Sequence, residues 1–172
     1  MKRIFLILLL LMLTVVAQKK NRITTDAKTG KAMLIGVCDR TAFVDTNFAW
    51  WFNSGYKFYH PEKDVMDSLK TEGNNFSVTI VMGTWCSDSR REVPRFYKIL
   101  DSIGYADSTL TLINVDRKKE GGATNIDSLN IKLIPTFIIY ENGNEIGRIT
   151  ETPKTNLEND LLNILNKKNA KQ

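Results

Sequence analysis

The spacing of hydrophobic and polar positions becomes regular after residue 75, where strands and helices alternate. Short β-branched apolar runs are typical of buried strands, and apolar positions three or four residues apart are typical of helices. An Asn142-Gly143 pair between two apolar runs predicts a hairpin turn. The elements predicted here are strands over 76–82, 109–115, 137–140 and 145–150 and helices over 86–103, 125–130 and 154–167. Alternation of this kind predicts a mixed α/β sheet with helices on both faces.

The preceding part of the chain is less regular. A short apolar run over residues 33–37 predicts a first strand, and residues 62–71 predict a helix. Residues 42–59 are predicted to be partly helical and contain eight aromatic side chains, in a chain with 3 Trp, 5 Tyr and 8 Phe. We interpret this segment as an aromatic-rich helical extension that packs on the sheet. The alternative is a groove in which aromatic side chains anchor a partner.

The first residues have the pattern of an export signal. Lys2 and Arg3 precede an apolar run over residues 4–16, and small residues end at Ala17. About 14 apolar residues are too few to span a bilayer, which takes roughly 20. We therefore predict a signal peptide over residues 1–17 and a periplasmic or extracellular location, with no membrane contact after cleavage. A buried core helix and an uncleaved anchor are the less favoured alternatives.

Composition and charge indicate one globular domain. The 172 residues include 42% hydrophobic and 25% charged residues, which is ordinary for such a domain. The net charge of +5 falls to +3 without Lys2 and Arg3, and much of the remaining excess lies near the chain ends. This distribution argues against a nucleic-acid surface. We predict a flexible lead-in over 18–31, a single domain over 32–168 and a tail over 169–172, and leave the oligomeric state open.

Two cysteines and one histidine limit the metal chemistry. Cys38 and Cys86 match no zinc-binding spacing, and His60 is the only histidine. We therefore expect no metal and no cofactor.

The chemistry is concentrated at the junction between the strand over 76–82 and the helix that follows. Cys86 lies at the start of that helix, where unpaired backbone N–H groups and the helix dipole favour a thiolate over a thiol. Asp88 opposes this effect by its charge, and the neighbouring arginines partly offset Asp88. A reactive Cys86 is the favoured interpretation, and a buried structural cysteine is the alternative.

The same segment resembles the active-site segment of the thioredoxin family. Trp85-Cys86-Ser87-Asp88-Ser89, followed by Pro94, is similar to that family's Trp-Cys-x-x-Cys motif and its following proline. Residues 131–137, with Ile134, Pro135 and Thr136, resemble the family's cis-proline segment, and residues 142–150 resemble the hairpin after it. The resemblance covers roughly residues 76–166 and predicts a thioredoxin-like fold.

The resemblance also implies the architecture of a site. The strand before Cys86 would lie in the centre of the sheet, and the Ile134–Pro135 peptide bond would be cis and would face the Cys86 sulfur. In the family, that loop aligns an extended substrate backbone, and the exposed tryptophan, here Trp85, flanks it. These features imply catalysis by Cys86 and Ser89, with Trp85, Ser87, Asp88, Ile134, Pro135, Thr136 and Glu151 supporting the site.

Three positions depart from the family pattern. Ser89 replaces the second cysteine, so the two-thiol reduction cannot take place. The Ser89 hydroxyl could still stabilise the Cys86 thiolate. Ile80 stands where the family has a buried acid, and Glu151 aligns with a glycine close to the site. Cys38 is expected at the same sheet edge as Cys86, but in the family's strand order another strand separates the two, which exceeds the reach of a disulfide. We therefore favour a buried or unpaired Cys38. A loop rearrangement that closes this gap and lets the two cysteines pair is the alternative.

Two classes of function remain. The first is a monothiol thiol–disulfide oxidoreductase or isomerase that acts through Cys86 on exported proteins bearing thiols or disulfides, and that could use a separate redox partner. The second is a redox-inactive thioredoxin-fold module that binds extended peptides or proteins near Pro135 and the aromatic segment. Retention of Trp85 favours the first class, whereas Ser89, Ile80 and Glu151 favour the second.

Overall fold

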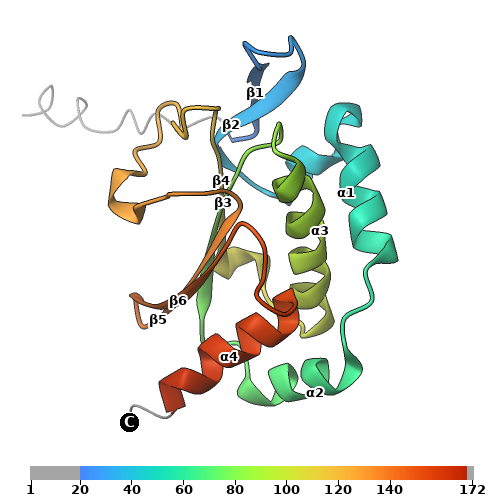
Figure 1. Cartoon of the computed structure of the whole chain (residues 1–172), viewed down its shortest axis with the longest axis vertical. Helices are drawn as coiled ribbons and strands as arrows, with labels where there is room; N and C mark the ends of the chain where they lie inside the picture. The colour runs from blue at the N-terminus through green and yellow to red at the C-terminus, as the bar shows by residue number, and fades with distance from the viewer. Residues whose placement is uncertain (1–19, 170–172) are drawn as a thin grey trace, which may run out of the picture.

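The computed structural model describes residues 20–169 (Figure 1). The predicted signal peptide over 1–17 and residues 170–172 of the predicted tail lie outside the described residues. The strands are β1 (Arg22–Thr25), β2 (Ala32–Cys38), β3 (Ser77–Met82), β4 (Leu110–Asn114), β5 (Thr136–Glu141) and β6 (Asn144–Thr150). The α-helices are α1 (Thr46–Phe58), α2 (Lys63–Glu72), α3 (Ser87–Ser102) and α4 (Leu157–Asn169). Three short 3-10 helices are η2 (Arg40–Val44), η3 (Asp107–Thr109) and η4 (Asp127–Leu129).

The six strands form one mixed sheet in the order β1-β2-β4-β3-β5-β6. Only β3 and β4 run parallel, and every other neighbouring pair is antiparallel. In this register Val81 lies opposite Ile113 on one side and Thr136 on the other. The carboxyl ends of β3 and β4 and the beginning of β5 therefore meet at one edge of the sheet.

The two faces of the sheet are covered differently. The four α-helices contribute to one large apolar cluster, in which Phe96 of α3 packs against Phe137 of β5 with ring centroids 4.4 Å apart. The other face carries a smaller cluster beneath the long connection between β4 and β5, which Figure 1 shows on the side away from α1 and α3. That cluster consists of Val81, Ile113, Val115, Ile126 and Ile134, with Trp85 and Cys86 packed against it.

The predicted mixed sheet flanked by helices is confirmed, with two corrections. The helix expected over 125–130 is a single 3-10 turn, η4, so in the described structure the second face carries no α-helix. The predicted flexible lead-in over 18–31 is wrong for residues 22–25, which form β1 and pair with β2. This strand escaped prediction because its residues, Arg-Ile-Thr-Thr, are mostly exposed at the sheet edge and show no apolar run.

The aromatic segment forms the extra helical layer that the sequence predicts. Asp45 caps α1 by accepting a hydrogen bond from the Asn47 backbone N–H. Phe48, Trp51 and Phe52 of α1 are buried, and α1 packs along α3 (Figure 1). The two helices approach closely because Gly55 lies against the ring of Pro94.

Candidate functional site

Cys86 is the N-cap residue of α3 and follows β3 after a short turn. Its backbone N–H donates to the Gly83 carbonyl at 2.9 Å, and its own carbonyl accepts from the Arg90 N–H at 3.1 Å, so the helix begins directly after it. The thiol is half-buried. The first N–H groups of a helix lack intrahelical partners and carry partial positive charge. Cys86 therefore lies next to these unpaired N–H groups, and its side chain makes no capping hydrogen bond to them.

The loop before β5 lies directly beside this sulfur. The Ile134–Pro135 peptide bond is cis. The Cys86 thiol donates to the Ile134 carbonyl, with 3.6 Å between Sγ and the oxygen. On the other side of this loop, the Thr136 hydroxyl donates to the Leu133 carbonyl at 2.7 Å, and the Glu151 N–H donates to the Pro135 carbonyl at 2.7 Å. These bonds fix the loop that the resemblance implied would face Cys86.

The three residues after Cys86 have different environments. Ser89 is fully buried, and its hydroxyl oxygen accepts a hydrogen bond from the Gly83 N–H at 3.3 Å. Among the described contacts it makes no hydrogen bond to the Cys86 sulfur. Ser87 is exposed, and Asp88 forms an ion pair with Arg91 at 2.9 Å. The charge of Asp88 is therefore directed to the helix surface, where Arg91 balances it.

Trp85 is held at its edge and on its face. Its indole N–H donates to the Val115 carbonyl at 2.9 Å, and the Arg117 guanidinium lies 4.6 Å from the ring centroid. Arg117 is in turn held by Asp26, with bonds of 2.7 Å from Nε and 2.8 Å from Nη2 to the two carboxylate oxygens. Sequence reasoning missed both Asp26 and Arg117. The turn-forming composition of residues 26–30 was the available signal for this hairpin.

The two other departures from the family pattern are Ile80, which lies in an apolar environment, and Glu151, which has a left-handed backbone conformation. The Ile80 side chain is fully buried in the larger apolar cluster, so no acid is available beneath the cysteine at this position. Glu151 has φ of 63°, a left-handed conformation that glycine adopts most easily. Its side chain is half-buried.

Cys38 lies away from Cys86, and its expected position is corrected. Because β2 runs antiparallel to β4, Cys38 pairs with Leu112, which lies opposite Ile80 in the middle of β3. A position at the same edge as Cys86, as expected from the sequence, requires a parallel β2, whereas β2 is antiparallel to β4. Both cysteines are free thiols. Burial raises the pKa of Cys38 to about 11 and keeps its thiol protonated.

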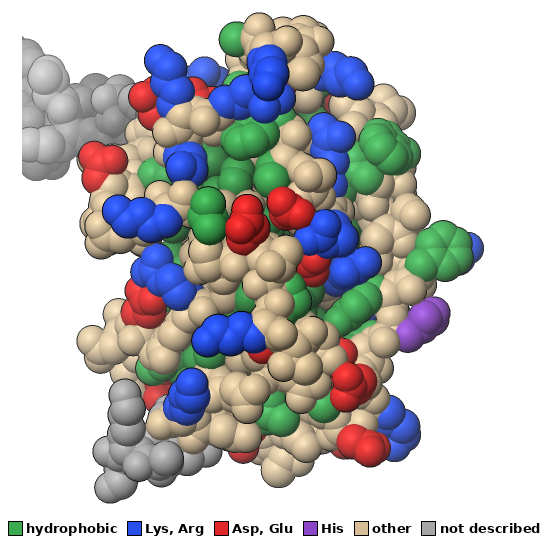
Figure 2. Space-filling view, in the orientation of Figure 1, with side chains coloured by type: hydrophobic (Ala, Val, Ile, Leu, Met, Phe, Trp, Pro, Cys, Tyr) green, Lys and Arg blue, Asp and Glu red, His purple; other side chains and the backbone are tan. Residues whose placement is uncertain are grey.

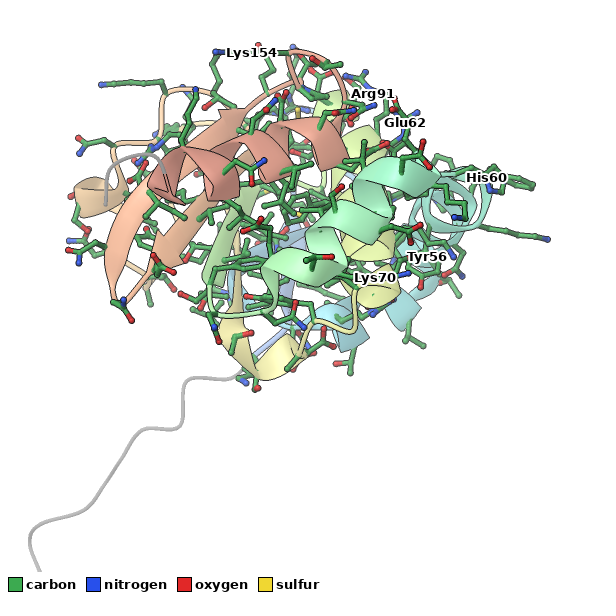
Figure 3. The ribbon with its side chains drawn as sticks, turned by 90° about the horizontal axis from the view of Figure 1, so that it is seen from below. Tyr56, His60, Glu62, Lys70, Arg91 and Lys154 are labelled. Carbon is green, nitrogen blue, oxygen red and sulfur yellow. The ribbon has the colours of Figure 1, made fainter. Side chains whose placement is uncertain are left out.

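Metal ligands do not gather anywhere in the described part of the chain. No group of three or more histidine, cysteine, aspartate or glutamate side chains is placed to hold an ion among residues 20–169. His60 is exposed and projects outward from the connection between α1 and α2 (Figure 3). Within the same residues, none of the helices combines the length and apolar character needed to cross a bilayer.

The sheet, the helix that starts at Cys86 and the facing cis-proline loop define a thioredoxin-like protein. Chicken (Gallus gallus) thioredoxin is 28% identical over 102 residues, which are 59% of this chain and 91% of that thioredoxin. A Pseudomonas aeruginosa protein of unknown function is 14% identical, with a TM-score of 0.54 over 78% of this chain and 93% of that one. An HIV epitope scaffold is 14% identical, with a TM-score of 0.51 over 74% and 81%. No protein-family model matches the chain.

The predicted resemblance is confirmed at the level of fold and family likeness. The similarity to thioredoxins supports a thioredoxin-like family, and the structural neighbours support the fold. A thioredoxin-like fold with a cysteine at the start of α3 suggests thiol–disulfide oxidoreductase chemistry.

Proposed function

We propose that the protein is an exported monothiol oxidoreductase or isomerase that exchanges disulfides of exported proteins at Cys86. One observation carries this proposal: the Cys86 sulfur stands at the N-terminus of α3 and contacts the carbonyl of Ile134 in the cis-proline loop. The attacking sulfur belongs to the residue that begins the helix, next to unpaired backbone N–H groups, and the loop supplies further backbone groups beside it. The apolar leader over residues 4–16 supports export. Export supports the exchange activity, because disulfides persist outside the cytoplasm.

The exchange takes place in two steps. The Cys86 thiolate attacks one sulfur of a substrate disulfide, a mixed disulfide forms, and the other substrate sulfur leaves as a thiolate that takes a proton from water. A second thiol then attacks the mixed disulfide and releases either the substrate or Cys86. Ser89 cannot perform the second attack, so the thiol comes from the substrate itself or from a separate molecule. Sulfur–sulfur bonds are exchanged one for one, with no net oxidation.

The direct test is formation of the mixed disulfide. Mature Cys38→Ala protein is mixed with a peptide that contains one disulfide, and the product is read by intact mass under denaturing, acid-quenched conditions. The proposal predicts a covalent adduct of peptide mass that an added thiol removes. The matched Cys86→Ser, Cys38→Ala protein should form none. An absent adduct in the Cys38→Ala protein, with Cys86 accessible to alkylation, would contradict the proposal.

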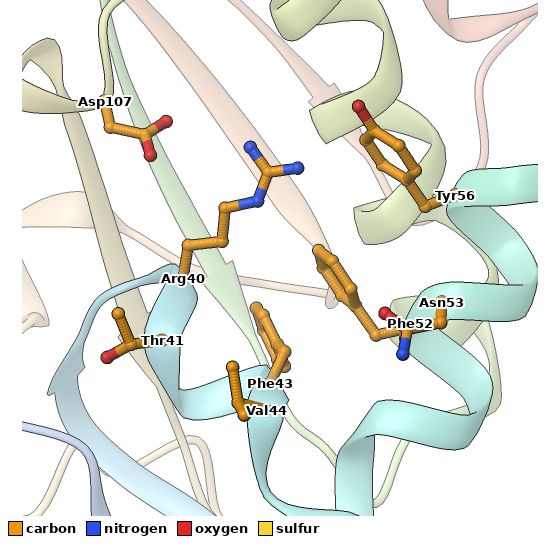
Figure 4. Close-up of a pocket in the computed structure, with 8 residues that line it drawn as sticks. All are labelled: Arg40, Thr41, Phe43, Val44, Phe52, Asn53, Tyr56 and Asp107. Carbon is orange, nitrogen blue, oxygen red and sulfur yellow. The ribbon is translucent and has the colours of Figure 1, made fainter.

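A redox-inactive binding module is the second candidate, and the surface of α1 favours it. Trp50 and Phe58 are 66% and 67% exposed, and Figure 2 shows hydrophobic side chains projecting from the side formed by α1. A cavity of about 440 Å³ lies between η2 and α1 (Figure 4). Arg40 lines this cavity and forms two hydrogen bonds with Asp101, at 2.8 and 2.7 Å. Peptide binding that survives Cys86→Ser but is lost in Trp50→Ala would support this candidate.

A further inference from the structure

A small cavity beside Trp85 carries an excess of positive charge. Its volume is about 140 Å³, and it lies between the β1–β2 turn, the start of α3 and the segment after β4. The charged side chains that line it are Asp26, Lys31, Arg90 and Arg117, so three cations face one carboxylate. Figure 2 shows lysine and arginine side chains gathered over this end of the molecule.

The carboxylate of Asp26 is already fully engaged in hydrogen bonds within the protein. Asp26 is 2% exposed and accepts two hydrogen bonds from Arg117, one from the Thr29 hydroxyl at 2.5 Å and one from the Lys28 N–H at 3.2 Å. These donors hold the Asp26 pKa well below its usual range, so the carboxylate stays ionised and paired. It is therefore a fixed support for Arg117 and leaves two cationic charges of the cavity uncompensated by its lining.

Of the two remaining cations, Arg90 is held by a hydrogen bond within the described structure and Lys31 is not. Arg90 donates through Nε to the Thr84 carbonyl, which fixes the base of its guanidinium over the turn before Cys86. The Lys31 ammonium has no hydrogen bond or ion pair within residues 20–169, although its residue lines the cavity. A cation held at the rim without an anion is available to a ligand that brings one.

This cavity adjoins the start of the helix that carries the reacting cysteine. Trp85, which lines it, directly precedes Cys86, and Arg90, which also lines it, donates to the carbonyl of Thr84 in the turn before Cys86. We infer that the cavity binds the carboxylate of a small thiol that exchanges at Cys86. The inference rests on the proposed function and names the class of its second thiol. A volume of about 140 Å³ accommodates a carboxylate and its adjacent methylenes but not a peptide strand.

The bound thiol supplies the sulfur that Ser89 lacks. With its carboxylate between Lys31 and Arg90, its thiolate attacks Cys86 Sγ in the mixed disulfide. A new bond forms between the two sulfurs, the bond to the substrate sulfur breaks, and the substrate leaves as a thiolate that takes a proton from water. The number of disulfide bonds is unchanged.

The test compares three thiols that share a two-carbon chain and carry an anionic, a neutral or a cationic terminal group. Cys38→Ala protein is loaded with a 2-pyridyl mixed disulfide at Cys86, and release of 2-thiopyridone is followed at equal thiolate concentrations of 3-mercaptopropionate, 2-mercaptoethanol and cysteamine. The same exchange on a small 2-pyridyl disulfide gives the intrinsic rates. After this correction we expect the acidic thiol to react roughly tenfold faster than the neutral one, the factor that one charge-assisted hydrogen bond supplies. Cysteamine should be the slowest.

Two variants assign the preference to the cavity. Lys31→Gln should reduce the ratio between the acidic and neutral thiols severalfold, whereas Lys57→Gln, which removes an exposed lysine of α1, should leave the ratio as it is. A second measurement does not depend on exchange: propionate is titrated into Cys86→Ser protein while the Trp85 indole N–H resonance is followed by NMR. We expect a saturable shift that Lys31→Gln weakens.

The outcomes separate the inference from the proposed function. Equal corrected rates for the three thiols, or a Trp85 resonance that propionate does not shift, would overturn the inference and leave exchange at Cys86 intact. Failure of every thiol to exchange at Cys86 would overturn the proposed function. The propionate titration would then test only whether the cavity binds a carboxylate.

Discussion

The Cys86 thiol donates a hydrogen bond to the Ile134 carbonyl oxygen at 3.6 Å, although 48 residues separate them in the chain. The contact exists because β5 begins beside the end of β3, with Thr136 opposite Val81. The cysteine at the start of α3 therefore faces the one loop whose backbone the cis Ile134–Pro135 bond and the Glu151 N–H hold in place. This arrangement has the parts of a thiol-exchange site without the second thiol.

Substitution Ser89→Cys should restore a two-thiol site. Cys86 is the N-cap of α3 and residue 89 is the third helical position, over which an N-cap side chain normally lies. After mild oxidation we expect an 86–89 disulfide, so that a thiol titration in denaturant finds one free thiol, Cys38, in place of three. Ser87→Cys is the control, since its side chain is exposed. Three titratable thiols in the monomeric Ser89→Cys protein would contradict the geometry.

The Cys38 thiol should be protected in the folded protein. It is 4% exposed, and burial raises its pKa to about 11. In the Cys86→Ser variant, which keeps Cys38 as the only thiol, alkylation at pH 8 should be very slow and should become fast in urea. Fast alkylation of the folded variant would show that the β2 placement of Cys38 is wrong.

The same thiol should also make stability depend on pH. A raised folded-state pKa means that the unfolded thiol ionises first, from about pH 8.5, while the folded thiol remains protonated to about pH 11. The unfolded state then binds fewer protons, so the free energy of unfolding should fall as pH rises through this window. Urea titrations of the Cys86→Ser protein should show this fall. The control Cys86→Ser, Cys38→Ala should show a smaller one.

The packing of α1 on α3 should not tolerate a side chain at residue 55. A Cβ at Gly55 would lie 2.6 Å from Cγ and 3.2 Å from Cβ of the rigid Pro94 ring. Gly55→Ala should therefore destabilise the protein by about 1–3 kcal/mol, the usual cost of overpacking, despite the better helix propensity of alanine. Ser54→Ala, on the exposed side of the same helix, is the control and should be neutral or slightly stabilising. An equal gain in urea midpoint for both variants would contradict the close contact.

The local sequence pattern predicts the strands and helices in which the apolar positions repeat clearly with the period of a strand or of a helix. The run over 76–82, the helix after Cys86 and the Asn142-Gly143 hairpin lie where the sequence placed them, because each has an apolar face to bury. The apolar pattern of a strand does not show its direction relative to its neighbours. The antiparallel course of β2 and the resulting position of Cys38 were therefore missed. The Asp26–Arg117 pair was missed because 91 residues separate its members and only the folded sheet brings them together.

Repeated disulfide exchange by Cys86 alone can be measured as the recovery of a substrate with scrambled disulfides. Cys38→Ala protein without residues 1–17, at catalytic concentration, is added to a scrambled-disulfide protein with a small-thiol buffer, and recovery of native substrate is followed in time. We expect Cys38→Ala to accelerate recovery as well as the unsubstituted protein does, and Cys86→Ser to give the uncatalysed rate. Equal recovery with and without Cys86 would rule out catalysed exchange at Cys86 and leave a thioredoxin-like binding module.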